Sequence, residues 1–205
     1  MKLYYSPGDC SLSPHIIALE AGVACELVRV SLQNHTLDDG SDFRAINPLG
    51  YVPYLDLGDG QTLHEGAVIA QYLADLTPEK QLMPAAGTFA RWKVLEWLNF
   101  IATELHKSYS PLYAASTPDD YKPVVRARLR QRYEWVEQQL TGDDYLLGSQ
   151  FCVADAYLFT TLNWARHGGI DLSGLHKLQA YHQRVARRPA VQAAMQAERL
   201  TFLSI

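Results

Sequence analysis

Hydrophobic and polar positions divide the chain into two stretches of different character. Up to about residue 76, short apolar runs bounded by glycine, proline or aspartate predict strands, and apolar positions spaced three or four residues apart predict helices. The predicted strands are residues 2–5, 25–30, 52–57 and 61–63, and the predicted helices are residues 13–21 and 66–76. The polar segment 33–47 predicts a loop with room for one helical turn. This order of elements is that of a small α/β unit.

Turn residues mark the boundaries between these elements. Gly22 ends the first predicted helix, and Gly58-Asp59-Gly60 predicts a hairpin between the last two strands. Proline at positions 78 and 84, followed by Gly87, indicates a connecting segment. We therefore expect a first domain over residues 1–80, a linker over 81–88 and a second domain over 89–205.

Beyond the linker the strand patterns disappear and only helical periodicity remains. The predicted helices are residues 89–109, 121–140, 154–165, 175–187 and 190–198. Residues 154–165 are apolar nearly all round, so this helix should lie in the core. Residues 121–140 carry an apolar stripe, with four arginines expected to point outward into solvent. The fold class is an α/β domain followed by an all-α domain.

Composition and charge narrow the classes of function. The chain has 205 residues, 48% hydrophobic and 20% charged, which is typical of a globular protein. A formal net charge of −4 argues against a nucleic-acid partner. Residues 1–80 hold 4 basic and 11 acidic residues, whereas residues 81–205 hold 14 and 11. This contrast suggests two units with different roles.

Neither a membrane segment nor a metal site is indicated. No apolar run reaches about 18 residues, and the N-terminus lacks the apolar core of a signal peptide. The three cysteines, Cys10, Cys25 and Cys152, are odd in number and widely spaced, which suggests neither a disulfide framework nor a zinc site. Reduced thiols point to the cytoplasm.

Cys10 stands where the first strand ends and the first helix begins. A thiol in this position is either a small buried hydrophobic group or, because a helix N-terminus lowers its pKa, a nucleophile. Ser13 occupies the place of the second cysteine of a C-x-x-C motif, which disfavours a dithiol redox cycle. Ser11 or Ser13 could equally serve to cap the helix.

Two further local signals accompany this cysteine. Val52-Pro53 places a proline at a strand start, where it fits a plain turn or a site for an extended peptide. Glu65-Gly66 precedes an apolar helix whose free N–H groups suit a carboxylate, while Glu65 would complement an ammonium group. Glu65 is otherwise read as a surface capping residue.

Taken together, five segments in order resemble a bacterial glutathione transferase of the beta class. They are MKLYYSPGDCSLSPHI, NPLGYVPYL, LHEGAVIAQYLAD, EWLNFIATELHK and FCVADAYLF, and they span nearly the whole chain. The resemblance implies a thioredoxin-like first domain, a cis proline at position 53 and a homodimer. It also implies glutathione as a thiol co-substrate without a further cofactor, and conjugation of glutathione to small apolar electrophiles as the activity, in a role such as detoxification.

The resemblance assigns roles to individual residues. It places Cys10 beside the glutathione sulfur and Val52 against the cysteinyl backbone of glutathione. It gives the γ-glutamyl head to Glu65 and Gly66. The polar residues it assigns to glutathione or to the neighbouring subunit's site on the first long helix are Asn99, Glu104, His106 and Lys107. Asn99, Thr103 and His106 have the spacing of one α-helical face, and His106 is expected to help Cys10 lower the pKa of the glutathione thiol.

Aromatic residues beyond His106 are candidates for the electrophile pocket. Tyr109, Tyr113 and Trp164 could form its walls, although core packing is an equally good reading of each residue. In the catalytic mechanism that we expect, Cys10 acts either as a thiol that donates a hydrogen bond or through a mixed disulfide with glutathione.

Two positions depart from the family pattern. His35 stands where the class usually has a lysine that contacts the glycyl carboxylate of glutathione, and a neutral imidazole is a weaker partner for an anion. Cys152 stands where the wider family has Ser or Thr as the cap of the core helix, three residues before Asp155. Sulfur is a poor acceptor, so we expect this cap to be weak.

Alternative functions remain open at this point. One is thiol–disulfide exchange through Cys10, with free glutathione resolving the mixed disulfide. Another is a non-catalytic protein that sequesters apolar ligands. A glutathione-dependent dehalogenase or isomerase is a further possibility within the family.

Overall fold

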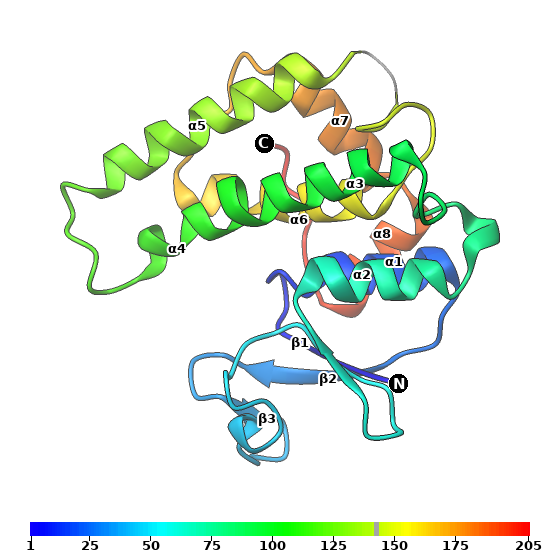
Figure 1. The fold of residues 1–205 in the computed structure, drawn as a ribbon. Helices are drawn as coiled ribbons and strands as arrows, with labels where there is room; N and C mark the ends of the chain where they lie inside the picture. The colour runs from blue at the N-terminus through cyan, green and yellow to red at the C-terminus, as the bar shows by residue number, and fades with distance from the viewer. Residues whose placement is uncertain (142–143) are drawn as a thin grey trace.

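The computed structural model describes residues 1–141 and 144–205, in which a small sheet and two helices lie beside a larger group of helices (Figure 1). The strands are β1 (Lys2–Tyr5), β2 (Glu26–Ser31), β3 (Thr36–Leu37), β4 (Tyr54–Asp56) and β5 (Thr62–His64). They lie in the order β3-β2-β1-β4-β5. Only β1 and β2 run parallel among these neighbours, so the sheet is mixed. This architecture confirms the predicted α/β domain.

One face of the sheet packs against its two helices. Leu3 pairs in register with Leu55 of β4, and neither residue is exposed to solvent. Because side chains alternate along a strand, both leucines point to the face covered by α1 (Leu12–Ala21) and α2 (Gly66–Asp75). The helices are thereby fixed above the ends of β1 and β4, which carry Cys10 and Val52 in the loops that adjoin them.

The opposite face of the sheet is covered by the segment predicted as a loop. Tyr4 and Tyr54 meet edge to face, with ring centroids 5.6 Å apart. Phe43, from the short 3₁₀ helix η1 (Phe43–Ala45), packs against both rings. The segment 33–47 therefore contains the expected helical turn and, in addition, the edge strand β3.

The second domain consists of helices around a buried central one. Its elements are α3 (Phe89–Phe100), η3 (Ile101–His106), α4 (Lys107–Tyr113), α5 (Lys122–Gln139), α6 (Val153–Gly168), α7 (His176–Ala186) and α8 (Pro189–Ala197). The short helix η2 (Pro78–Lys80) follows α2. Most residues of α6 are buried, as its apolar sequence predicts. Within the described ranges no helix is long and apolar enough to cross a membrane.

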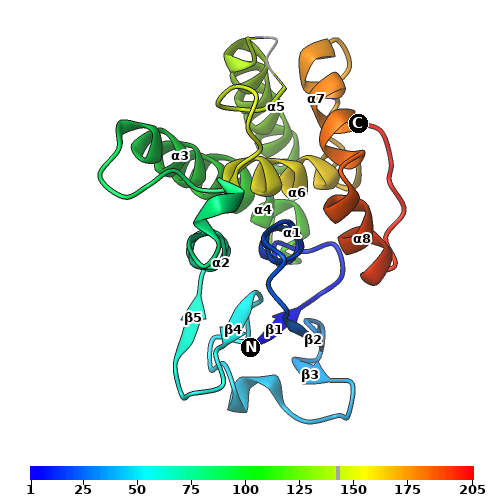
Figure 2. The same cartoon turned by 90° about the vertical axis from the view of Figure 1, so that its right-hand side faces the viewer.

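The two domains share one continuous hydrophobic core. Buried side chains of α1 and α2 form a single cluster with those of α3 to α8. Figure 2 shows α1 lying between α6 and α8, so the helix that follows Cys10 is held from above by the second domain. The exact boundaries 1–80, 81–88 and 89–205 stay a prediction.

The first long helix is not a regular α-helix. The sequence pattern predicts one continuous helix over residues 89–109, but Ile101–His106 forms a π-helical segment between α3 and α4. A π turn closes i→i+5 hydrogen bonds, so it holds more residues than an α turn. The spacing that predicts one face for Asn99, Thr103 and His106 therefore does not apply. Asn99 and Thr103 are exposed, whereas His106 is half-buried.

The arginines of α5 are not simply solvated. Arg126 donates through Nε to the carbonyl oxygen of Gly168 at 2.9 Å. Arg130 donates to the carbonyl oxygen of Asp171 at 2.6 Å. Arg132 binds the Glu104 carboxylate at 2.7 Å. These contacts attach α5 to the end of α6 and to η3, so the three arginines have a structural function.

Helix α6 begins directly after its N-cap residue Cys152, as predicted. The Asp155 carboxylate accepts hydrogen bonds from the backbone N–H groups of Cys152 and Leu146, each at 2.9 Å, and from the Tyr181 hydroxyl at 2.8 Å. The Cys152 thiol is buried, and burial together with Asp155 raises its pKa. The contact from the Cys152 N–H to the Asp155 carboxylate is thus well formed. The reciprocal contact of the capping box depends on the Cys152 sulfur as the acceptor.

Candidate active site

Cys10 lies in the turn between β1 and α1, two residues before the helix begins. Its half-buried thiol donates to the carbonyl oxygen of Val52, with 3.1 Å between sulfur and oxygen. Burial and the Asp9 carboxylate raise the pKa of this thiol to about 12, against the lowering by the N–H groups of Cys10 and Ser11. In the free protein burial thus outweighs the helix N-terminus, which favours the reading of Cys10 as a buried, protonated thiol.

The peptide bond between Val52 and Pro53 is cis, in agreement with the resemblance. Gly66, the first residue of α2, faces this proline: a Cβ built on Gly66 would lie 3.4 Å from Pro53 Cγ and 3.7 Å from the Cys10 carbonyl oxygen. Residues 10, 53 and 66, which are distant in sequence, therefore meet at one point. This is where the resemblance places the glutathione backbone.

Glu65 precedes α2 in an unusual backbone conformation. Its φ is +67° and its ψ is 113°, a region that non-glycine residues rarely adopt. Its carbonyl oxygen accepts hydrogen bonds from Val68 and Ile69, and its side chain is exposed. The strain at this residue turns an acidic side chain outward beside the free N–H groups at the start of α2.

His106 stands at the end of η3 and is joined to α6. Its Nδ1 lies 2.6 Å from the hydroxyl oxygen of Tyr157. Burial and the Lys107 charge lower the pKa of His106 to about 4, so the ring is neutral near pH 7. Burial, with Cys10 and Glu65 nearby, raises the pKa of Tyr157, so this hydroxyl keeps its proton. The sequence indicates for Tyr157 only a place in an apolar core helix, and no local signal predicts its position beside His106.

The hydrogen-bond count assigns the proton between these two residues. If Nδ1 carried the proton and donated it, no described contact would accept the proton of the Tyr157 hydroxyl. If Tyr157 donates to Nδ1, the neutral ring carries its own proton on Nε2. The second arrangement satisfies both groups and leaves an N–H donor on His106.

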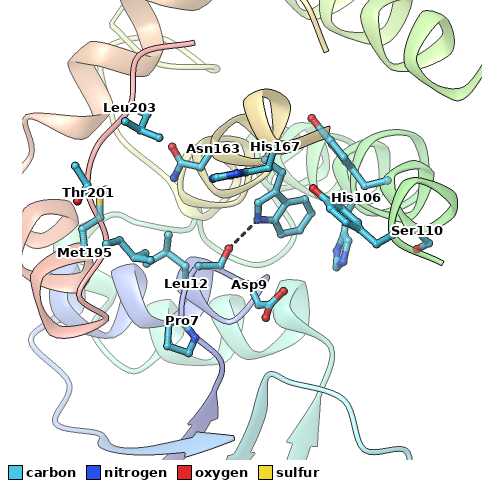
Figure 3. Close-up of a pocket in the computed structure, with 15 residues that line it drawn as sticks. Pro7, Asp9, Leu12, His106, Ser110, Asn163, His167, Met195, Thr201 and Leu203 are labelled. Atoms are coloured by element: carbon cyan, nitrogen blue, oxygen red, sulfur yellow. Dashed lines mark hydrogen bonds between the residues drawn. The ribbon is translucent and has the colours of Figure 1, made fainter. Parts of the chain in front are cut away.

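A cavity of about 480 Å³ adjoins His106 between the two domains (Figure 3). The residues that line it include Pro7, Asp9, Leu12, His106, Tyr109, Tyr113, Asn163, Trp164, Met195 and Leu203. All three aromatic residues predicted for an electrophile pocket are among them. The C-terminal segment beyond α8 closes one side through Leu200, Thr201 and Leu203, although no local sequence pattern indicates this role.

The aromatic residues of the cavity differ in whether their polar atoms already have a hydrogen-bond partner within the protein. The Tyr109 hydroxyl lies 2.9 Å from that of Tyr133, which in turn donates to the carbonyl oxygen of Thr161. Tyr109 must therefore donate to Tyr133, and only its ring faces the cavity. Trp164 donates through Nε1 to the carbonyl oxygen of Gly8 at 2.8 Å. Tyr113 is 59% exposed, so its hydroxyl is accessible.

The loop before Cys10 is held by the second domain from two sides. While Trp164 donates to the Gly8 carbonyl oxygen, the Gly8 N–H donates to the buried Glu198 carboxylate at 2.9 Å. The other oxygen of Glu198 pairs with His15 of α1 at 2.8 Å. Gly8 itself has a φ of +76°, which favours glycine. The position of Cys10 thus depends on α6 and α8.

His35 is not among the residues that line the cavity. Its φ is +55°, and its Nδ1 lies 3.2 Å from the carbonyl oxygen of Gly50. A carbonyl oxygen only accepts, so Nδ1 carries a proton and Nε2 of a neutral ring has none to donate. A Cβ on Gly50 would come within 2.7 Å of Nδ1, so this contact also requires glycine.

The remaining polar residues of the first long helix are not gathered at the cavity. Asn99 and Lys107 are exposed. Glu104 binds Arg132 at 2.7 Å and Arg128 at 3.6 Å, and the hydrogen bond from Arg132 lowers the pKa of the carboxyl group. Their predicted roles toward glutathione or a neighbouring subunit stay predictions.

Comparison with known proteins identifies this arrangement. A family described as Glutathione S-transferase, N-terminal domain, matches residues 9–76, and one described as Glutathione S-transferase, C-terminal domain, matches residues 100–189. This chain belongs to the glutathione S-transferase family. The matched segments contain Cys10, Val52 and Glu65 in the first domain and His106 in the second.

Individual members of the family are similar over almost the whole chain. Glutathione S-transferase GstA of Escherichia coli O157:H7 is 48% identical over 98% of this chain and 100% of its own length. The ternary complex of BphK, a bacterial glutathione transferase, has a TM-score of 0.94 at 52% identity and covers 98% of this chain and 100% of its own. The bacterial beta-class enzyme of Sphingomonas chungbukensis has a TM-score of 0.93 at 40% identity, with the same coverage. The predicted beta-class resemblance is confirmed, and transferase activity is favoured over a non-catalytic binding role.

Proposed function

We propose that this glutathione transferase joins the glutathione sulfur to small, largely apolar electrophiles held in the cavity beside His106. The observation that carries the proposal is the convergence of Cys10, Val52 and Gly66 next to a cavity that His106 and three aromatic residues line. Glutathione is the co-substrate in this family.

Glutathione would lie in extended form along the loop that ends in Pro53. The backbone N–H and C=O groups of Val52 suit pairing with its cysteinyl residue, as in strand addition. The γ-glutamyl carboxylate would meet the free N–H groups at the start of α2, and Glu65 would attract its ammonium group. His35 would face the glycyl carboxylate.

Two donors would then stabilise the glutathione sulfur as a thiolate. With a raised pKa, Cys10 keeps its proton and donates it to a sulfur anion instead of to the Val52 carbonyl. The Nε2–H of neutral His106 is the second donor. Hydrogen bonds to the charged form lower the pKa of a thiol. The thiol proton leaves to solvent.

Conjugation follows by direct attack. The thiolate sulfur forms a bond to the electrophilic carbon, and the leaving group departs with the electron pair of its former bond, or, in an addition, the pair moves onto the acceptor atom. The rings of Tyr109 and Trp164 orient the apolar part of the electrophile. Positioning and a lowered thiol pKa supply the rate enhancement.

Thiol–disulfide exchange through Cys10 receives less support. Exchange requires Cys10 as an attacking thiolate, and a pKa of about 12 leaves little of that form near pH 7. A paired assay of wild type and Cys10→Ser separates the roles. We expect conjugation of a general aromatic electrophile to fall only several-fold, because serine can still donate a hydrogen bond. Loss confined to reduction of a glutathione mixed disulfide would instead make Cys10 a redox nucleophile, and two unchanged activities would make it structural.

We also propose that the chain acts as a homodimer. Large apolar side chains are exposed on both domains: Leu49 and Tyr51 at 63% and 66%, and Phe89 and Trp92 of α3 at 77% and 62%. Such exposure supports burial against a second copy. Sedimentation of wild type and Tyr51→Asp tests this, with a shift to monomer expected in the variant.

The three free cysteines fit a reducing compartment, which supports the predicted cytoplasmic location and a role in detoxification there.

A further inference from the structure

His182 of α7 is a buried histidine placed beside the cavity but not in it. Its ring stacks against Phe159 of α6, with centroids 5.1 Å apart, and against Phe202 of the C-terminal segment at 5.0 Å. Its side chain has no exposed surface. Burial lowers the pKa of His182 to about 4, so the ring is neutral near pH 7 and has one donor and one acceptor.

The only hydrogen bond described for the ring goes to Asn163. Nε2 lies 2.8 Å from the side-chain oxygen of Asn163, and Nδ1 has no partner. A buried N–H without a partner is rarer than a buried acceptor without one. The proton of the ring therefore lies on Nε2 and is donated to the Asn163 oxygen.

This bond fixes the orientation of the Asn163 amide. With its oxygen turned to His182, the NH₂ group is the part left for the cavity, which Asn163 lines. Figure 3 shows Asn163 extending from α6 near the C-terminal segment that carries Leu203, on the far side of the cavity from His106. Met195, Leu12 and Leu203 make much of the surrounding surface apolar. Thr201 and His167 also line this part of the cavity, and the amide is the group whose orientation a buried partner fixes.

We infer that Asn163 is a specificity-determining residue, and that it selects aromatic electrophiles bearing a hydrogen-bond acceptor, such as a nitro or carbonyl oxygen, remote from the reacting carbon. His182 acts through Asn163 as a positioning residue. The inference rests on the proposed function, because the cavity must hold the electrophile. An acceptor matched to the amide gains a bond in a partly dry site, whereas an apolar group of the same size leaves the NH₂ group unpaired.

The test compares two conjugates that differ only at the remote end. S-(4-nitrobenzyl)glutathione carries the acceptor, and S-(4-isopropylbenzyl)glutathione carries an apolar group of similar bulk. Their dissociation constants are measured by calorimetry for wild type, Asn163→Leu and His182→Phe. Gln138→Leu, an amide-to-leucine change at an exposed position on α5, is the matched control. The conversion of two benzyl isothiocyanates with the same ring substituents, 4-nitro and 4-isopropyl, is followed in parallel.

We expect wild type to prefer the nitro conjugate, and Asn163→Leu to reduce this preference by about 3- to 10-fold, the range of one neutral hydrogen bond. His182→Phe should retain the stacking and lose part of the preference, while Gln138→Leu should keep it. Equal affinities in wild type, or an undiminished preference in Asn163→Leu, would overturn the inference even if glutathione is conjugated. If neither conjugate binds and no isothiocyanate is consumed, the proposed function fails as well.

Discussion

The hydroxyl of Tyr157 and Nδ1 of His106 lie 2.6 Å apart, and this contact joins the core helix α6 to the wide turn η3. Tyr157 keeps its proton and His106 is neutral, so the tyrosine determines which ring nitrogen carries hydrogen. The donor that His106 presents is thus set by a residue that the proposed mechanism does not bring into contact with substrate.

Replacing Tyr157 by Phe should therefore weaken thiolate stabilisation without removing His106. The ring can then take either tautomer, so we expect the pKa of enzyme-bound glutathione to rise by about one unit and kcat/KM near pH 7 to fall about 10-fold. The measurement is the ultraviolet absorbance of the bound thiolate as a function of pH. Tyr121→Phe, an exposed tyrosine-to-phenylalanine change, is the control. Superimposable titration curves for wild type and Tyr157→Phe would refute this role.

His35→Lys should improve the use of glutathione. In the present structure Nδ1 of His35 faces the Gly50 carbonyl, which leaves a neutral ring without a donor for the glycyl carboxylate. A lysine ammonium supplies charge and donors, so KM for glutathione should fall about 3-fold or more. Initial-rate kinetics at saturating electrophile measure it, with His176→Lys as a control for added charge at a distant exposed position. An unchanged or higher KM in His35→Lys would count against the prediction.

Cys152→Thr should stabilise the protein. A hydroxyl is a better acceptor than a thiol for the N–H groups at the start of α6, and Asp155 is already in place for a complete capping box. We expect a gain of about 0.5–2 kcal/mol in the free energy of unfolding. The urea midpoint reports it, with Cys25→Thr as the control away from a helix cap. A midpoint that stays or falls would show that the sulfur already suffices.

Acid should destabilise the protein in a window set by its buried histidines. A histidine whose folded pKa is about 4, below its unfolded value near 6.5, holds stability that is complete above pH 6.5 and is lost as the pH falls toward 4. Between pH 7 and pH 4.5, the free energy of unfolding of His182→Phe should fall by roughly 1–3 kcal/mol less than that of wild type. The decrease that remains includes the part due to His106. Urea unfolding at the two pH values measures the difference. Identical losses in wild type and variant would contradict it.

Local patterns were sufficient where a single element decides the outcome. The glycines at 58 and 60 do separate β4 from β5, and the apolar run of α6 does lie in the core. The family resemblance rested on such segments and is confirmed by the comparisons. The same resemblance implies the cis Val52-Pro53 bond that the structure contains.

Properties that depend on distant residues were not predictable in this way. The pKa of Cys10 rises because burial there outweighs the helix N-terminus, and its partner is a carbonyl 42 residues away. Tyr157 and Asn163 read as parts of a core helix, since nothing local shows what faces them. The prediction that Asn99 and His106 share one face holds only for a regular α-helix, and no residue type in Ile101–His106 indicates a π-helical turn.

That wider turn makes the position of His106 depend on the number of residues before it. Each residue of an α-helix advances the chain by about 100° around the axis. A π turn holds about one residue more than an α turn, so Ile101–His106 accommodates one extra residue while α3 and α4 keep nearly the rotation of a regular helix. Inserting or deleting a residue within the regular turns of α3 would instead rotate everything that follows by about that angle. His106 would then leave Tyr157, and Tyr109 would leave the core, although neither side chain had been altered.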